Sequence, residues 1–207
     1  IACMDTFSRY TVRPMRPKDI AQVAGIERVC FPESWSVTDF EWEFALKRAS
    51  CYLVACDRWR ARSLWAGRRR PSAIMDFVTG LRHLWGAISA PAVTREYIVG
   101  YVGLRFVADE AHLTSIAVRE EYRRKGIGEL LFNSALEVTL ERKARMVILE
   151  VRSSNLAAQA LYSKYGFAEA GVRRRYYSDN GEDGLIMTRD NSTSVSSKSV
   201  PSGHGGK

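Results

Sequence analysis

The chain has 207 residues, and its 31 lysine and arginine residues against 23 aspartate and glutamate residues give a formal net charge of +8. A hydrophobic fraction of 46% and a charged fraction of 26% are typical of a folded globular protein and exclude a largely disordered one. No apolar run reaches the roughly 18 to 20 residues of a membrane-spanning helix, which excludes a spanning protein.

The positive charge is concentrated in one segment. Between residues 58 and 95 there are eight arginines and a single acid, Asp76, which gives that segment a net charge of +7. The basic character therefore belongs to one segment and leaves the rest of the chain nearly neutral.

Cysteine usage and the N-terminal residues indicate a cytoplasmic protein. Its four cysteines form no C-x-x-C pair, and no histidine cluster has the spacing of zinc ligands. We therefore expect reduced, structural cysteines and no metal. No charged segment followed by an apolar core opens the chain, so no secretory signal is expected.

Hydrophobic periodicity and turn residues predict alternating strands and helices. Gly126 opens the longest predicted helix, and the apolar run over 146–151 is typical of a strand covered on both faces. In chain order we predict a strand over 10–14, helices over 19–29 and 38–46, strands over 51–57, 98–107 and 112–119, a helix over 126–143, a strand over 146–151, a helix over 155–164, and strands over 167–177 and 185–188. The order predicts a mixed α/β sheet flanked by helices.

Two segments stand apart from this pattern. Residues 58–96 form an insert, so we expect a single domain over 1–188 that this insert interrupts. The polar residues 189–207 are predicted to be a disordered tail, because they have too little apolar surface to offset the entropy cost of ordering.

One motif suggests an anion site. Arg123, Arg124, Lys125, Gly126, Ile127 and Gly128 follow a predicted strand and open the longest predicted helix. Backbone N–H groups at a helix start lack intrahelical partners, and glycines let a phosphate approach the backbone. No Lys-Ser/Thr follows the second glycine and no third glycine is present, so neither a P-loop nor a dinucleotide fingerprint fits. A tight turn with a solvated basic rim is the alternative.

The wider context resembles a known superfamily. The order strand, R-x-x-G-x-G, helix, apolar strand, then N-x-x-A-x-x-L-Y-x-x-x-G-F is similar to the GCN5-related N-acetyltransferases. Within that superfamily, L-E-V-R-S-S-N over 149–155, R-R-R-Y-Y over 173–177 and N-G-E-D-G-L-I-M over 180–187 resemble the ribosomal-protein-alanine N-acetyltransferases. The resemblance covers about residues 10–57 and 97–188, and it implies a mixed, mostly antiparallel central sheet flanked by helices.

The resemblance implies two catalytic residues. Glu150 matches the general base that takes the proton of the attacking amine, and Tyr162 matches the general acid that protonates the departing thiolate. An acid satisfied by Arg152 or a backbone amide is the alternative for Glu150, and a core tyrosine is the alternative for Tyr162.

The resemblance also implies binding residues for acetyl-CoA and for the peptide. An N–H on the strand at 116–118, expected to be that of Val118, would polarise the thioester. Asn155 matches a contact to acetyl-CoA, and a helix N-cap is an equally good interpretation. Large aromatics near turns can also be ordinary packing. The complete expected set is Ile116, Ala117, Val118, Arg123, Arg124, Lys125, Gly126, Ile127, Gly128, Glu129 and Asn155 for acetyl-CoA, and Trp35, Tyr176 and Tyr177 for the peptide.

The insert is not explained by the resemblance. Its second half has apolar residues at helical spacing from Ile74 to Ile88, and three tryptophans lie within it. A helix folded over the domain with solvated arginines is one interpretation. Docking on ribosomal RNA, contact with a membrane surface and a groove for a protein partner are the others.

Together these features predict a cytoplasmic enzyme that moves acetyl from acetyl-CoA to the α-amine of a protein N-terminus. The resemblance implies a small-subunit ribosomal protein beginning with alanine as the leading substrate. A broader N-terminal or lysine ε-amine acetyltransferase is the alternative within the enzyme class. A catalytically idle module that binds through the insert is the alternative from a different class.

Overall fold

The computed structural model describes residues 9–31, 35–45, 49–60 and 96–192. Seven strands form one sheet in the order β1-β2-β3-β4-β5-β7-β6. The elements are β1 (Tyr10–Pro14), η1 (Pro17–Asp19), α2 (Ile20–Cys30), α3 (Val37–Ala45), β2 (Ser50–Asp57), β3 (Tyr97–Val107), β4 (Glu110–Val118), η3 (Glu120–Tyr122), α6 (Ile127–Glu141), β5 (Met146–Arg152), α7 (Leu156–Lys164), β6 (Ala168–Tyr177) and β7 (Glu182–Asp190).

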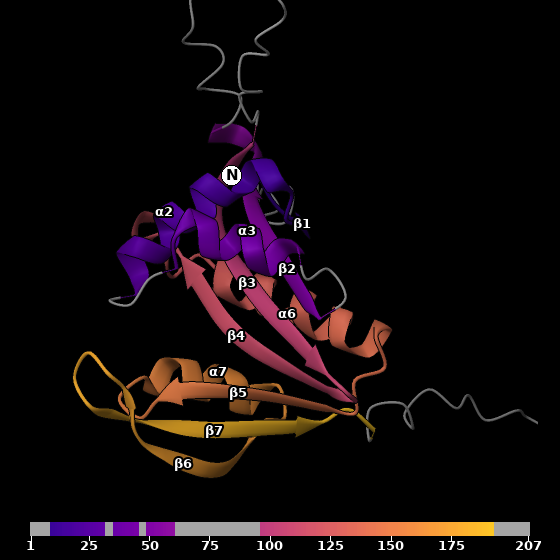
Figure 1. The fold of residues 1–207 in the computed structure, drawn as a ribbon, viewed down its shortest axis with the longest axis vertical. Coiled ribbons are helices and arrows are strands. Elements are labelled where there is room, and N and C mark those ends of the chain that lie inside the picture. The colour runs from indigo at the N-terminus through magenta and orange to yellow at the C-terminus, as the bar shows by residue number, and fades with distance from the viewer. Residues whose placement is uncertain (1–8, 32–34, 46–48, 61–95, 193–207) are drawn as a thin grey trace, which may run out of the picture.

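The sheet is mixed and mostly antiparallel, as the sequence predicts. Every neighbouring pair of strands is antiparallel except β4 with β5, which run parallel. Parallel neighbours need a crossover, and here η3 and α6 supply it between β4 and β5. Figure 1 shows β4 and β5 lying together at one end and diverging toward the other.

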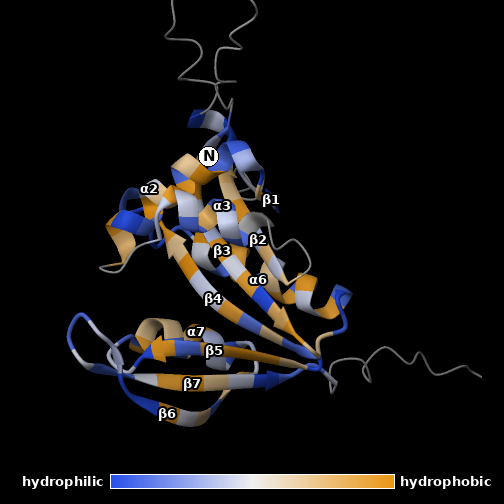
Figure 2. Cartoon of the chain, in the orientation of Figure 1, coloured by the Kyte–Doolittle hydropathy of each residue, from blue (hydrophilic) through white to orange (hydrophobic). Residues whose placement is uncertain are grey.

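Helices cover the two faces of the sheet unequally. On one face α6 and α7 pack over strands from both halves of the sheet, and Leu131, Phe132 and Tyr162 belong to this core. On the other face α2 and α3 pack over β2, β3 and β4, with Ile26 and Phe40 fully buried there. The largely hydrophobic central strands in Figure 2 fit this two-sided packing.

Strand β5 differs from the sequence prediction. Its residues alternate between buried and half-buried, so only the face of Val147, Leu149 and Val151 is fully covered. The reason is that α2 and α3 stop short of this part of the sheet. Half-buried Ile148, Glu150 and Arg152 are therefore available to line a site.

The C-terminal boundary also lies later than the sequence predicts. Strand β7 begins at Glu182 and continues through Asp190. Asn191 is 3% exposed and donates hydrogen bonds to Thr139 Oγ1 and to the Ala144 carbonyl. Asn191 is therefore part of the folded domain through hydrogen bonds and not through apolar burial. Hydrophobic patterning cannot detect such a residue. The rest of the predicted tail lies outside the described residues.

The amphipathic stretch of the insert lies outside the described residues as well. The residues that flank it are fixed by Asp57 at the end of β2, whose Oδ1 accepts the backbone N–H groups of Trp59 and Arg60. Its Oδ2 accepts Arg9 Nη2 at 2.7 Å and the Tyr122 hydroxyl at 3.1 Å. Asp57 is fully buried and lies opposite Tyr97 of β3 in the sheet.

Candidate active site

The site begins where β4 and β5 separate. The two strands pair only from Glu110 opposite Met146 to Leu113 opposite Leu149. Beyond Leu113 the register of β4 against β3 shifts, and Thr114 is the extra residue. Such a bulge bends its strand and increases its twist. The last part of β4 therefore runs free of β5 and leaves one edge of its backbone unpaired by a strand.

The alternation of the ladder shows which groups face this gap. The Arg119 N–H donates to the Val99 carbonyl on the β3 side. Because successive residues of a strand direct their N–H and C=O groups to opposite sides, those of Val118 and Ile116 point toward the gap. In agreement, the Val118 carbonyl accepts Arg123 Nε at 3.2 Å. The Val118 N–H thus faces the place where the resemblance puts the thioester carbonyl.

Beyond β4, η3 leads to the glycine-containing loop. Gly126 has φ +76° and caps α6, and Arg124 is also left-handed with φ +60°. The Leu130 N–H is bonded to the Gly126 carbonyl at 2.9 Å, so the N–H groups of residues 127–129 belong to the unpaired first turn. The helix dipole adds positive potential at this point.

Packing leaves room around the same loop. A Cβ at Gly126 would meet no atom within 4 Å, and one at Gly128 would reach only Val118 Cγ2, at 4.0 Å. Protein packing therefore does not require a glycine at position 128. A ligand that approaches the helix start closely would require one, so these residues fit a bound pyrophosphate.

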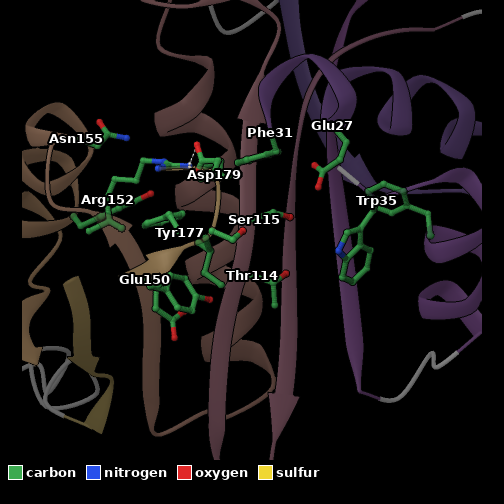
Figure 3. Close-up of a pocket in the computed structure, with 17 residues that line it drawn as sticks. Glu27, Phe31, Trp35, Thr114, Ser115, Glu150, Arg152, Asn155, Tyr177 and Asp179 are labelled. Carbon is green, nitrogen blue, oxygen red and sulfur yellow. Dashed lines mark hydrogen bonds and ion pairs between the residues drawn. The ribbon is translucent and has the colours of Figure 1, made fainter. Parts of the chain in front are cut away.

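The predicted catalytic and substrate residues meet in one cavity. It has a volume of about 490 Å³, and its wall includes Glu150, Tyr162, Trp35, Tyr176 and Tyr177. They come from β5, α7, the segment before α3, and the end of β6. Figure 3 shows side chains from both halves of the sheet lining this space. Residues far apart in sequence thus share one hollow of the size that small-molecule sites have.

Glu150 lies on the half-covered face of β5, and its side chain is 18% exposed. One carboxylate oxygen forms an ion pair with Arg173 Nη1 at 3.1 Å. The alternative partner considered from the sequence, Arg152, is bound instead to Asp179 and Glu182. A positioned carboxylate at the cavity wall can accept a proton from an amine.

Tyr162 reaches the cavity from the other face of the sheet from Glu150, and it is buried, with 6% exposure. Its ring packs against Phe132 at 5.0 Å and Phe167 at 6.1 Å between centroids. Burial raises the pKa of its hydroxyl to about 12, with a smaller contribution from Tyr177. The hydroxyl is therefore protonated at neutral pH, which is the state that a proton donor needs.

The peptide-side tyrosines are positioned by an irregular stretch of β6. The register of β6 against β7 shifts between Arg173 and Tyr177, and Arg175 has φ +53°. The Tyr176 ring lies against Gly184, where a Cβ would come within 2.9 Å of Cδ1. The Arg152 guanidinium lies 3.9 Å from the centroid of the Tyr177 ring. Both tyrosines are thus held at the cavity wall.

The remaining predicted residues have more varied surroundings. Asn155 caps α7, with its Oδ1 accepting the Ala158 N–H at 3.2 Å, and it also lines the cavity, so both interpretations stand. The Glu129 carboxylate is bound to Lys164 Nζ and the Tyr165 hydroxyl. The side chains of Ala117 and Ile127 are buried in the core. Ala117 and Ile127 can therefore offer a ligand only their backbone groups.

Sequence reasoning missed Glu27. This residue of α2 lines the same cavity and is 6% exposed. It continues the apolar stripe of Ile20, Val23 and Ala24 at offset 7. An acid on the buried face of an amphipathic helix is rare unless it is paired or functional, and this was the available signal.

Fold and site together define a class of enzyme, and comparison with known proteins identifies the family. The model of the Acetyltransferase (GNAT) family matches residues 59–167. This chain belongs to the GNAT acetyltransferase family.

Two relatives that match most of this chain are named as acetyltransferases of protein N-termini. A Bacillus subtilis (strain 168) protein provisionally named ribosomal protein bS18-alanine N-acetyltransferase is 50% identical over 87% of this chain and 95% of its own length. An N-alpha-acetyltransferase of Saccharolobus solfataricus is 36% identical over 87% of this chain and 92% of its own length. The expected family resemblance is confirmed.

Solved structures share the fold. The ribosomal-protein-S18-alanine N-acetyltransferase of Escherichia coli superposes with a TM-score of 0.62 at 24% identity, covering 87% of this chain and 93% of that one. A NatC complex bound to Gag peptide and CoA gives a TM-score of 0.61 at 16% identity, covering 88% and 98%.

The described residues lack two features, a membrane-spanning helix and a cluster of metal ligands. No helix among them is long and apolar enough to cross a membrane. Nor does this part of the chain gather three His, Cys, Asp or Glu side chains that could hold a metal ion. Cys30, Cys51 and Cys56 are free thiols.

Proposed function

We propose that this protein transfers acetyl from acetyl-CoA to the α-amine of an N-terminal alanine, and that its substrate is a ribosomal protein of the bS18 type. The observation that carries the proposal is the gap between β4 and β5, where Ser115 and Ile116 of β4 line a cavity whose wall also includes Glu150 and Tyr162. The substrate follows from the name of the Bacillus subtilis relative, which is 50% identical over 87% of this chain.

Acetyl-CoA supplies the thioester, and the chain supplies its binding groups. The N–H groups of residues 127–129 with Arg124 and Lys125 suit the pyrophosphate, since N–H groups at a helix start and basic side chains both favour anions. The pantetheine arm would follow the free edge of β4. There the Val118 N–H would donate to the thioester carbonyl and stabilise the negative charge that develops on its oxygen.

The two catalytic side chains divide the proton transfers. Glu150 takes a proton from the nitrogen as the N–C bond forms, and Tyr162 gives its proton to the sulfur as the C–S bond breaks. The two groups reach the cavity from opposite sides of the sheet, so base and acid remain separate. Trp35, Tyr176 and Tyr177 would hold the first residues of the peptide.

Thiol release in the presence of acetyl-CoA tests this function. The substrates are peptides beginning with Ala, Ser or Met, together with a peptide that has a blocked N-terminus and an internal lysine. We expect turnover on the alanine peptide and none on the blocked one. Turnover on the blocked peptide alone would establish a lysine acetyltransferase, and the absence of turnover on every peptide would favour a binding module.

A further inference from the structure

A second carboxyl group lies in the cavity and has no role in the mechanism above. Glu27 of α2 is 6% exposed, and within the described part of the chain its Oε2 has no hydrogen-bond partner. The backbone N–H of Trp35 donates to the carboxyl group, which fixes it beside the substrate side of the cavity. In Figure 3 the carboxyl group is directed toward the interior of the cavity, across from Glu150.

Among the residues that the structure describes, this carboxyl group has no charge partner. No basic side chain in the described ranges forms an ion pair with Glu27, whereas Glu150 has Arg173 at 3.1 Å. Tyr52, on the neighbouring strand β2, is a phenol whose pKa Glu27 raises further. A buried carboxyl oxygen without a donor is costly unless a ligand supplies one.

Other charged groups on the elements around α2 are engaged elsewhere or exposed. On η1, Asp19 binds Arg13 and Lys18 is exposed, and on β4, His112 binds Glu110. On α3, Glu43 binds Arg105, Asp39 binds Ser36 and Glu41 is exposed. On β3, Tyr101 is fully buried, and its hydroxyl has no partner among the described residues. Within the described residues these groups leave the Glu27 oxygen without a donor, and an ammonium group that enters the cavity can supply one.

We propose that Glu27 receives the α-ammonium group of the peptide and accepts the first of the two protons that leave its nitrogen. This inference rests on the proposed function. In the transfer, R–NH₃⁺ gives one proton to Glu27 and becomes R–NH₂. The nitrogen then attacks the acetyl carbon and loses its second proton to Glu150, while the C–S bond breaks and the sulfur takes the proton of Tyr162. One proton is released overall as the three side chains return to their starting states.

This arrangement also favours α-amines over lysine side chains. Burial raises the pKa of Glu27 to about 7, and the Trp35 N–H opposes that shift. A peptide α-ammonium has a pKa of about 8 and a lysine ammonium one of about 10.4. The equilibrium constant for transfer of the proton to Glu27 is therefore about one tenth for the α-ammonium and below about one thousandth for a lysine ammonium.

The pH profile of Glu27→Gln tests the proposal. For the wild-type protein, kcat/KM on the alanine peptide should pass through a maximum between about pH 7 and pH 8, because it requires an ionised Glu27 and a protonated amine. The amide variant cannot take the proton. Its kcat/KM should fall about tenfold to a hundredfold at pH 7, rise with the amine's own pKa near 8, and stay high above it.

Glu43→Gln is the matched control, because Glu43 is 7% exposed on the adjacent helix but does not line the cavity. It should keep the wild-type profile even if it unfolds at a lower temperature. If Glu27→Gln fails to fold, Glu27→Asp replaces it, and this variant should retain the maximum because it retains an acid. A wild-type profile in Glu27→Gln would overturn the proposal.

Peptide binding separates this proposal from the proposed function. With CoA present, calorimetry should show that Glu27→Gln weakens binding of the free alanine peptide about tenfold and leaves that of its N-acetylated form unchanged. That result without turnover would refute the function and retain the ammonium site. Turnover with binding and pH profile independent of Glu27 would retain the function and refute the site.

Discussion

At the scale of single residues, two glutamates in one cavity differ in their surroundings. Glu150 is partly exposed and forms an ion pair with Arg173. Glu27 is buried, and its Oε2 has no hydrogen-bond partner among the described residues. In enzymes such differences assign acid and base roles to chemically identical side chains. Here the differences fit a Glu27 that binds the ammonium group and a Glu150 that takes a proton as the N–C bond forms.

Replacement of Glu150 by Gln tests its catalytic role. The variant keeps the size of the side chain but cannot accept the proton, so we expect kcat to fall about a hundredfold or more. The affinity for acetyl-CoA should stay near the wild-type value, because the anion loop is untouched. Steady-state kinetics and calorimetry with CoA measure the two effects.

Glu137→Gln is the control for this change, since Glu137 is exposed on α6. It should behave as the wild type does. Wild-type turnover in Glu150→Gln would remove Glu150 from the mechanism.

The sequence predicted some site residues and not others for a physical reason. Glu150, Tyr162 and Asn155 lie in contiguous motifs, so their pattern is visible without a structure. Arg173 reaches Glu150 only because β7 lies between β5 and β6 and brings the two together. That pairing depends on strand order, which a linear pattern does not contain.

At the scale of elements, the start of α6 combines a structural cost with a binding role. Gly128 lies in the first turn, where alanine would favour the helix, and its Cβ would meet nothing closer than 4.0 Å. Gly128→Ala should therefore raise the free energy of unfolding by up to about 1 kcal/mol and raise the KM for acetyl-CoA about tenfold. Thermal unfolding and initial-rate kinetics measure these opposite effects.

Gly25→Ala is the matched variant, because Gly25 lies within α2 and a Cβ there also has nothing within 4 Å. It should be stabilised similarly with an unchanged KM for acetyl-CoA. An unchanged KM in Gly128→Ala as well would contradict the placement of the pyrophosphate.

The packing of β7 against β6 gives a second prediction at this scale. Gly184→Ala would place a Cβ 2.9 Å from Cδ1 and 3.2 Å from Cβ of Tyr176, which forces the tyrosine away. We expect the KM for peptide to rise about tenfold with little change in the KM for acetyl-CoA. Initial rates with each substrate varied in turn measure the two constants.

Gly171→Ala, on the neighbouring strand, would make only an ordinary contact at 3.8 Å with Ile186 and should leave both constants unchanged. Equal effects of Gly184→Ala on both substrates would argue against a peptide-side role for Tyr176.

The order and type of the elements were predictable, while their ends were less so. The apolar patterns of α2, β3 and α6 have the periods of helices and strands, and their predicted bounds lie within two residues of those found. At the end of α6, Lys143 is left-handed with φ +59°, so the helix stops at Glu141. The separation of β4 from β5 follows from a bulge at Thr114, whose glycine lies not on β4 but opposite it on β3, at Gly103.

At the scale of the whole molecule, one face of the sheet is covered from β1 to β7, with the edge strand β6 exposed, and the other face is only half-covered. Helices α2 and α3 cover only β2 to β4, and the cavity lies where that cover ends. The basic segment between residues 58 and 95 connects the end of β2 to the start of β3. This end of the two strands lies opposite the end that carries the β3–β4 turn. That end of the sheet also carries the C-terminal part of β4, because Gly100 of β3 lies opposite Val118, and Arg60 Nη1 there donates to the Tyr122 hydroxyl of η3 at 3.3 Å.

We predict that the domain does not need residues 61–95 for folding or for chemistry on short peptides. Asp57 and Tyr97 are opposite each other in the sheet, so a short turn can join Arg60 to Glu96. The shortened protein should unfold cooperatively and keep kcat/KM on the alanine peptide within about threefold of the wild type. Circular dichroism and thiol release measure this, and loss of cooperative unfolding would show that the segment belongs to the core.

The same shortened protein tests the RNA interpretation of the insert. If the arginines bind ribosomal RNA, the full chain should bind it with an affinity that falls steeply with salt, and the shortened protein should not. Salt-independent binding would contradict that interpretation, and flotation with anionic liposomes would support the membrane interpretation instead.

The central claim is that this GNAT protein acetylates an N-terminal α-amine, and a single peptide tests it most directly. A peptide with a free N-terminal alanine and an internal lysine is incubated with acetyl-CoA and the full chain, and tandem mass spectrometry locates the added acetyl group. We predict the acetyl group on the alanine nitrogen and an unmodified lysine. Acetyl on the lysine with the alanine free, or an unmodified peptide, would contradict the claim.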